Sequence, residues 1–263
     1  MSTADALVVE HLEVRFGGVR AVHDLSLTAP VGRITGLIGP NGAGKSTTFN
    51  ACSGFVRPTS GTVRFGTVDL TGAPSSRRAH CGIGRTFQRM ELFDTLSVRE
   101  NVALGREARM AGTSPLRQLL PAAGEAEVVA AATARALALC GLEASAGERA
   151  GSLSTGQRRL VELARALAGD FRLLLLDEPS SGLDVHESRR FAELLREVVD
   201  ATGVGILLVE HDMRVIADVC DYVYVLDFGE LIAEGIATNV LVDDVVRAAY
   251  LGTEPVPVPG GPS

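Results

Sequence analysis

A glycine-rich run at residues 39–47 is the part of the sequence best suited to holding an anionic group. It fits the pattern G-x-x-x-x-G-K-S/T and consists of Gly39, Pro40, Asn41, Gly42, Ala43, Gly44, Lys45, Ser46 and Thr47. Glycines let backbone N–H groups converge on phosphate oxygens without Cβ collisions, and a helix that starts here adds the positive end of its dipole. The pattern predicts a nucleotide site in which Lys45 reaches the β- and γ-phosphates, Ser46 binds Mg²⁺ and Thr47 bonds the α-phosphate.

The segments around this run have the order that a phosphate loop requires. Residues 33–38 (RITGLI) form a short β-rich segment, and the segment from Lys45 to Gly54 has no proline and is typical of a helix. The alternative interpretation, a chance glycine-rich turn, is disfavoured by this strand, loop and helix order. The loop alone does not distinguish among kinases, GTPases and motor proteins, so the other motifs must decide.

Further polar groups follow apolar runs that predict buried strands. The run 173–176 (LLLL) is followed by Asp177 and Glu178, and the run 205–209 (GILLV) is followed two residues later by His211. Ligands of open α/β sheets collect at the carboxyl ends of strands, and a neutral imidazole both donates and accepts hydrogen bonds. An isolated acidic pair after a core strand is also typical of a solvated turn. The acids therefore indicate a functional site only in combination with the other motifs.

The run Leu153, Ser154, Thr155, Gly156 and Gln157 precedes a segment with apolar residues at helical spacing, 158–168 (RRLVELARALA). Ser154 and Gln157 form a capping-box pattern, which predicts a helix start at this point. The uncapped N–H groups of a helix start are also a ready anion site. A well-capped helix without further function is the alternative interpretation of this run.

With these runs in place, the sequence resembles the ATP-binding cassette family over essentially residues 7–253. The family signature is L-S-G-G-Q, and the glycine loop, acidic strand end and switch residues occur here in the matching order. The resemblance implies two cassettes paired head to tail, with each signature (Ser154, Thr155, Gly156 and Gln157) closing over the γ-phosphate of ATP held by the other. Thr155 departs from the commonest glycine, so its side chain must fit beside the phosphate.

The resemblance also implies roles for individual residues. Asp177 supports Mg²⁺, and Glu178 is the catalytic residue that polarises the attacking water. Gln88 contacts Mg²⁺ or water at the start of a helical insert, and His211 senses the γ-phosphate. Two further family roles fall on Asp184, in the segment that links the two active sites, and on Phe16, which stacks on adenine. A lone phenylalanine that ends a strand is more usually a core residue.

Other runs resemble transporter cassettes in particular. Residues 83–88 and 92–102 look like the region that docks a cytoplasmic helix of a membrane partner, while FGGVRAV, EHDM, AEG and VVRAAYLG are similar to ATPase subunits of branched-chain amino acid importers. The implied partners are a second cassette, permease subunits and a solute-binding protein. A lipopolysaccharide-export cassette is the alternative. Non-transport ATPases acting on nucleic acid or ribosomes form a different class, which usually has tandem cassettes or a long coiled coil.

The resemblance implies an α/β fold: a P-loop NTPase core with a mostly parallel sheet, an antiparallel β subdomain and an inserted α-helical subdomain at about 88–168. We expect one domain over residues 1–254 and a disordered tail at 255–263, because proline and glycine build no core. The net charge of −7 argues against broad electrostatic attachment to nucleic acid. With neither a membrane-spanning run nor a signal sequence, we expect a cytoplasmic protein held at the inner membrane face by its permeases.

Overall fold

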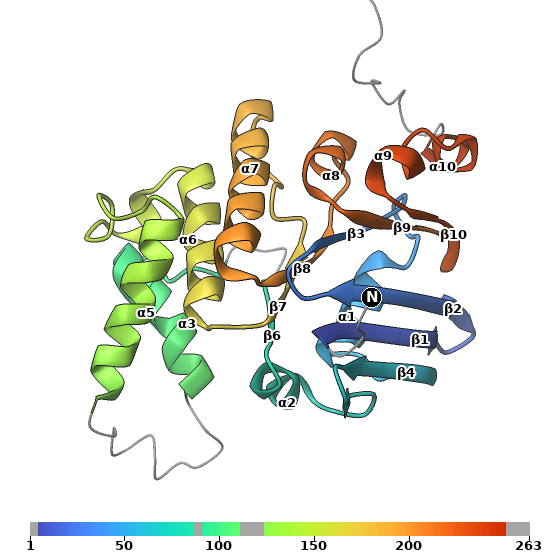
Figure 1. The fold of residues 1–263 in the computed structure, drawn as a ribbon, viewed down its shortest axis with the longest axis horizontal. Coiled ribbons are helices and arrows are strands. Elements are labelled where there is room, and N and C mark those ends of the chain that lie inside the picture. The colour runs from blue at the N-terminus through green and yellow to red at the C-terminus, as the bar shows by residue number, and fades with distance from the viewer. Residues whose placement is uncertain (1–4, 87–90, 111–123, 251–263) are drawn as a thin grey trace, which may run out of the picture.

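Two β-sheets organise the computed structural model, which describes residues 5–86, 91–110 and 124–250 (Figure 1). The larger sheet has the order β10-β9-β3-β8-β7-β6, in which β9, β3, β8, β7 and β6 are parallel and β10 is antiparallel. The smaller sheet has the order β2-β1-β4-β5 and its pairings are antiparallel. The predicted α/β fold with a mostly parallel sheet and an antiparallel sheet is therefore confirmed.

The strands of the larger sheet are β3 (Ile34–Ile38), β6 (Ile83–Arg85), β7 (Leu173–Asp177), β8 (Gly205–Val209), β9 (Tyr222–Asp227) and β10 (Glu230–Gly235). Those of the smaller sheet are β1 (Ala6–Phe16), β2 (Val19–Pro30), β4 (Ser60–Phe65) and β5 (Val68–Asp69). The helices are α1 (Lys45–Ser53), α2 (Ser75–His80), α3 (Val98–Met110), α5 (Glu125–Leu139), α6 (Thr155–Ala168), α7 (Val185–Thr202), α8 (Met213–Val219), α9 (Ala237–Val240) and α10 (Asp244–Tyr250), with a 3₁₀ turn at Ala150–Ser152.

The core lies on both faces of the larger sheet, and β7 shows how the sequence produces it. Leu173 and Leu175 point into a cluster with α1 and the smaller sheet, whereas Leu174 and Leu176 point into a cluster with α6 and α7. Figure 1 shows α7 and α8 on one side of this sheet and the smaller sheet on the other. Because both faces are covered, an unbroken leucine run is the expected pattern for such a strand.

The first hairpin differs from expectation in one respect. The sequence predicts that short strands continue up to residue 29, but the structure has a single strand, β2, over Val19–Pro30. Its pairing with β1 includes a register shift between the pairs Leu12↔Leu25 and Val14↔Val22, and Asp24 of β2, within that gap, has a φ of 51°. Such bulges bend a strand without ending it, so polar interruptions in the sequence do not mark breaks here.

The stretch that we expected to be helical contains α3, α5 and α6, which pack against one another and against α7. The sequence also predicts a helix over residues 189–199, between the two apolar strand runs. That helix, α7, begins four residues earlier, at Val185. The reason is Asp184, whose carboxylate accepts a hydrogen bond from the backbone N–H of Glu187 and caps the helix. The expected tail, 255–263, lies outside the described residues.

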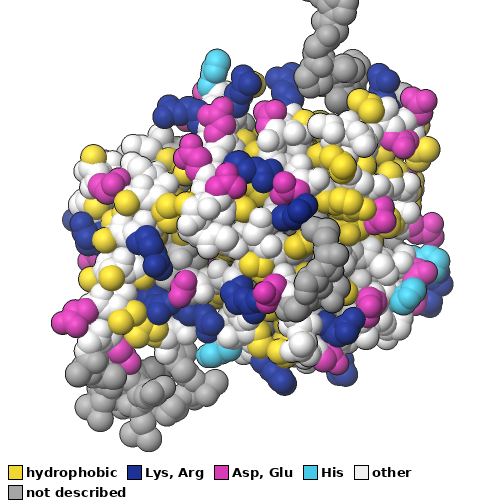
Figure 2. All heavy atoms as spheres, in the orientation of Figure 1, with side chains coloured by type: hydrophobic (Ala, Val, Ile, Leu, Met, Phe, Trp, Pro, Cys, Tyr) yellow, Lys and Arg dark blue, Asp and Glu magenta, His cyan; other side chains and the backbone are white. Residues whose placement is uncertain are grey.

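Charged side chains of both signs are mixed on the face of the molecule shown in Figure 2. Figure 2 shows arginines interspersed with aspartates and glutamates on the face in view, without a continuous basic area there. Among the described residues, no helix has both the length and the apolar character needed to cross a membrane.

Candidate nucleotide site

Three polar segments meet at one edge of the larger sheet. The loop from Gly39 follows β3, the pair Asp177 and Glu178 ends β7, and His211 lies just beyond β8. Because β3, β8 and β7 are adjacent and parallel, their carboxyl ends share this edge. The backbone N–H of Glu178 donates to Val209 O across 2.9 Å, which joins two of the three segments directly.

The glycine loop has a conformation that side chains would prevent. Gly39 has a φ of 149°, and a Cβ built there would lie 2.1 Å from Leu226 O. Gly44 has a φ of 96°, and its Cβ would lie 2.6 Å from Ala21 O. Gly44 is also the N-cap of α1 and supplies no side chain to bond the first helical N–H groups. The loop thus passes close to its neighbours and presents backbone donors to an anion.

Lys45 lies nearly buried across this loop. Its Nζ donates to Gly39 O at 2.6 Å and to Pro40 O at 3.0 Å. Burial lowers the pKa of Lys45, and the negative charges of Glu178 and Asp177 oppose that shift, so both acids lie within electrostatic reach. Lys45 forms no ion pair with any residue of the described ranges. A cation held by neutral carbonyls is suited to binding a phosphate.

Asp177 is buried at the end of β7, and its carboxylate accepts a hydrogen bond from Arg85 at 3.1 Å. Burial raises the pKa of Asp177, while the Arg85 guanidinium lowers it. The next residue, Glu178, has a φ of 47°, an uncommon conformation for a side-chain-bearing residue. This turn ends β7 abruptly and points the chain away from the strand direction.

Glu210 is a buried acid beside the candidate site that we did not single out from the sequence. It is fully buried, and its Oε1 accepts from Ser180 N at 2.9 Å while Oε2 accepts from His211 N at 3.3 Å. The Nδ1 atom of His211 lies 3.8 Å from Oε2. Glu210 thereby connects the segment after Glu178 to His211. A carboxylate directly after an apolar strand was the available signal.

The signature run forms the start of α6 as predicted. Ser154 Oγ accepts from Gln157 N at 3.2 Å and Gln157 Oε1 accepts from Ser154 N at 3.1 Å, which confirms the capping box. Ser154, Thr155 and Gln157 are exposed, and a Cβ at Gly156 would lie 2.7 Å from Glu187 Oε1. In Figure 1, α6 and α1 lie apart. The signature at the start of α6 therefore does not contact the phosphate loop before α1 in the same molecule.

The other three candidate residues, Gln88, Phe16 and Asp184, lie outside the segments described so far. Gln88 lies outside the described residues. Phe16 ends β1 with 53% of its surface exposed, so it is not a core residue. Asp184 is exposed and forms a capping box with Glu187 at the start of α7.

The fold and the edge of strand ends, with a glycine loop, a lysine and paired acids, define the class of P-loop nucleoside triphosphatases. Comparison with known proteins identifies the family. The model described as ABC transporter matches residues 22–181. The chain therefore belongs to the ABC transporter family, as an ATP-binding subunit that hydrolyses ATP.

Individual relatives cover nearly the whole chain. The high-affinity branched-chain amino acid transport ATP-binding protein LivG of Escherichia coli is 36% identical over 249 residues, which span 94% of this chain and 97% of LivG. The lipopolysaccharide export system ATP-binding protein LptB of Escherichia coli is 37% identical over 251 residues, 94% of this chain and 98% of LptB. A crystal structure of the ADP conformation of MJ1267, an ATP-binding cassette of an ABC transporter, is 33% identical with a TM-score of 0.83, covering 94% of this chain and 99% of that one.

Proposed function

We propose that residues 39–47 hold the phosphates of ATP and that Glu178 is the general base of hydrolysis. The observation that carries the proposal is the shared edge at which the glycine loop, Asp177, Glu178 and His211 meet. Lys45 binds the β- and γ-phosphates, Glu178 polarises the attacking water, and His211 contacts the γ-phosphate. A positioned base of this kind contributes about 10² to 10⁴ in rate.

We further propose that Ser46, Asp177 and Gln88 hold Mg²⁺. A hydroxyl, a carboxylate and an amide carbonyl supply the hard oxygen donors that this ion prefers. Ser46 follows Lys45 in the sequence, and Asp177 lies within electrostatic reach of Lys45 in the structure. When bound, Mg²⁺ neutralises phosphate charge during the reaction. Thr47, at the start of α1, bonds the α-phosphate, and the exposed ring of Phe16 stacks on adenine.

The signature acts on the nucleotide of a second cassette in this proposal. Ser154, Thr155 and Gln157 are exposed, and α6 lies apart from α1, so an anion at the helix start has to come from another molecule. Asp184, also exposed, lies next to the signature because Gly182 approaches the Thr155 side chain. Both segments would then face the partner cassette.

Replacing Glu178 with Gln tests these roles. The amide keeps the size of the side chain but is no base, so turnover should fall by about 10² or more while ATP affinity stays within about twofold. A nucleotide-dependent dimer should accumulate, as measured by light scattering with ATP. Steady-state hydrolysis near the wild-type rate, or a monomer at saturating ATP, would contradict the proposal.

We propose uptake of branched-chain amino acids or similar small polar solutes as the transport function, through permease partners and a solute-binding protein. LivG supports this proposal by its identity and length match. LptB matches to the same degree and supports lipopolysaccharide export as the second candidate. In either case the chain works as a peripheral subunit on the cytoplasmic face of the membrane.

Co-expression with permease and solute-binding-protein genes, if they are found beside its own gene, separates the candidates. Import predicts that vesicles containing the complex accumulate labelled leucine or valine in an ATP-dependent manner, and that Glu178→Gln abolishes the accumulation. Co-purification with an export apparatus instead, without amino acid uptake, would overturn the import proposal. Salt-dependent binding to DNA or ribosomes would favour the non-transport class.

A further inference from the structure

Two ionisable side chains of α6, Arg159 and Glu162, are buried where the helices meet the larger sheet. They are 6% and 5% exposed, and Arg159 Nη1 donates to Glu162 Oε2 at 2.9 Å. They line a small cavity together with Leu176, Pro179 and Phe191. Apolar residues of similar size stabilise a buried position as well as an ion pair does, so the pair calls for an explanation other than stability.

The guanidinium of Arg159 also holds the segment that follows Glu178. Its Nε and Nη2 atoms donate to Ser181 O at 3.3 and 3.1 Å. Ser181 lies three residues after Glu178, and its N–H donates to Glu178 O at 3.1 Å. Arg159 is therefore linked to the backbone of Glu178, the proposed base, through hydrogen bonds to a single intervening residue, Ser181.

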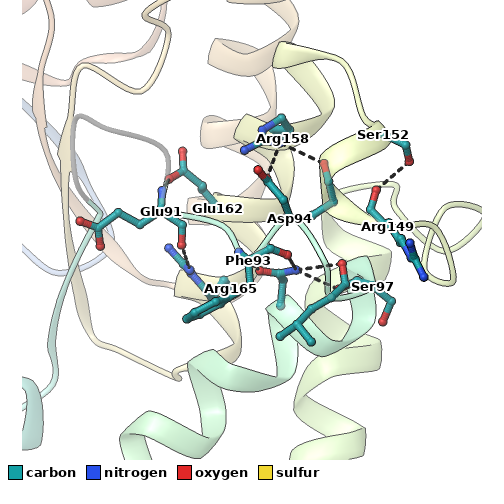
Figure 3. A network of polar contacts seen from close by, with 12 residues as sticks. Glu91, Phe93, Asp94, Ser97, Arg149, Ser152, Arg158, Glu162 and Arg165 are labelled. Atoms are coloured by element: carbon teal, nitrogen blue, oxygen red, sulfur yellow. Dashed lines mark hydrogen bonds and ion pairs between the residues drawn. The ribbon is translucent and has the colours of Figure 1, made fainter.

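The carboxylate of Glu162 holds a second segment. Its Oε1 accepts from Glu91 N at 3.2 Å, and Arg165, one turn further along α6, donates to Glu91 O at 2.6 Å. Figure 3 shows Glu162 and Arg165 directed at the two backbone groups of Glu91. Glu91 lies three residues beyond Gln88. One helix thus binds the chain close to two proposed active-site residues.

We propose that the buried Arg159–Glu162 pair is a positioning element for ATP hydrolysis, which fixes the turn after Glu178 and the chain beyond Gln88 relative to each other. The inference rests on the proposed roles of Glu178 and Gln88. The pair touches no reacting atom and acts by holding backbone. Its loss should therefore reduce kcat, because small displacements of a base are costly in rate, while KM for ATP changes little.

The double variant Arg159→Met/Glu162→Met is the main test. Each single replacement removes one charge of the buried pair and leaves the other, whereas the double variant removes both charges and fills the space with apolar side chains. We expect a melting temperature close to that of the wild type, KM within about twofold, and a kcat lower by about tenfold to a hundredfold. A kcat that recovers together with the melting temperature would show a merely structural role and overturn the proposal.

A second variant keeps the test decisive if the double variant does not fold. Arg159→Lys retains the charge but not the fixed fork of donors, so kcat should fall severalfold at unchanged KM. Wild-type kcat in this variant, or a loss that lies entirely in KM, would overturn the proposal.

The chain offers a matched control in Arg196, which pairs with Asp221 at 3.1 Å and also donates to a backbone carbonyl, that of Val219. This pair lies at the opposite edge of the larger sheet, where Asp221 accepts from Ile34 N at the start of β3. Arg196→Met should lower the melting temperature without changing kcat. Glu178→Gln in the same assay separates the two proposals. If Glu178→Gln is active, the proposed role of Glu178 is wrong. If Glu178→Gln is inactive but the double variant is fully active, only the positioning role of the Arg159–Glu162 pair is wrong.

Discussion

Arg85 and Asp177 form a nearly buried ion pair across the neighbouring strands β6 and β7. The distance between Arg85 Nη2 and Asp177 Oδ2 is 3.1 Å, and the same guanidinium donates at 2.7 Å to Asn50 and to Ser53 of α1. Arg85 thus connects the acid at the strand end to the helix that follows the phosphate loop. The guanidinium carbon also lies over the rings of Phe49 and Phe55, 5.5 and 5.4 Å from their centroids, at cation–π distance.

Replacing Arg85 with Met should destabilise the fold by about 3 kcal/mol, because it leaves Asp177 buried without this partner. Urea unfolding measures the loss. The variant Arg85→Met/Asp177→Asn should be less destabilised than the sum of its single replacements, since the second removes the orphaned charge. Additive effects in this double-mutant cycle would show that the two side chains do not interact.

Lys45 is the only lysine of the chain, so acylation of a lysine side chain reports on this site alone. If the ammonium binds phosphate, ATP should protect it from acylation, and mass spectrometry should show the modification shift only in nucleotide-free protein. Lys45→Ala should weaken ATP binding by about tenfold to a hundredfold, the value of one charge-assisted hydrogen bond. Unchanged affinity in titration calorimetry, or acylation that proceeds equally with ATP, would contradict the role of the loop.

Gly39→Ala should destabilise the protein by about 2–3 kcal/mol and impair ATP binding, since the new Cβ would approach Leu226 O at 2.1 Å and the φ of 149° is unfavourable for alanine. Gly18→Ala is the matched control, because a Cβ there meets nothing within 4 Å. The control should stay within about 0.5 kcal/mol of the wild type in urea unfolding. Equal effects of the two replacements would refute the steric explanation.

Burial raises the pKa of the Glu210 carboxyl, although hydrogen bonds from Ser180 and the charge of nearby His211 oppose the shift. The folded state therefore binds a proton more readily than the unfolded chain, and stability falls as pH rises above the ordinary carboxyl value of about 4.3. Gln does not titrate. The stability of Glu210→Gln relative to the wild type should therefore increase between pH of about 4.5 and 7.

Glu100 is a control for that experiment, because its pKa is shifted in the opposite direction. Hydrogen bonds from Ser97 lower the pKa of Glu100, so its contribution to stability is present above the ordinary carboxyl value and is lost as pH falls through the lowered one. The difference between Glu100→Gln and the wild type should be constant over the same pH interval. A parallel change in both variants would show that general charge, not burial of Glu210, causes the pH dependence.

The sequence was sufficient to predict the strand ends that carry the site. Apolar runs such as 173–176 and 205–209 form strands because both faces of the larger sheet are covered, and the polar residues after them share one edge as parallel topology requires. The capping box at Ser154 could also be predicted from the sequence, because its two partners are three residues apart. Local pattern and strand topology account for these features.

The buried polar partners could not be predicted in the same way. Arg85 and Asp177 are 92 residues apart, and Glu91 and Glu162 are 71 apart, so only the packing of distant elements brings them together. The sequence around Arg85, Glu91 and Glu162 shows ordinary charged residues, which are typical of a solvated surface. The early start of α7 is a local example, because capping by Asp184 was overlooked in favour of its place in a longer motif.

The positive φ of Glu178 means that, at this one position, the backbone conformation favours glycine whereas the proposed reaction requires a carboxylate. A left-handed backbone costs a side-chain-bearing residue roughly 1 kcal/mol, and glycine would relieve this cost at once. Selection for a more robust protein would thus pull position 178 toward the residue that removes the carboxylate. Thermostabilising libraries of this chain should therefore be screened for turnover as well as for heat resistance, since their easiest gain at this position is an inert protein.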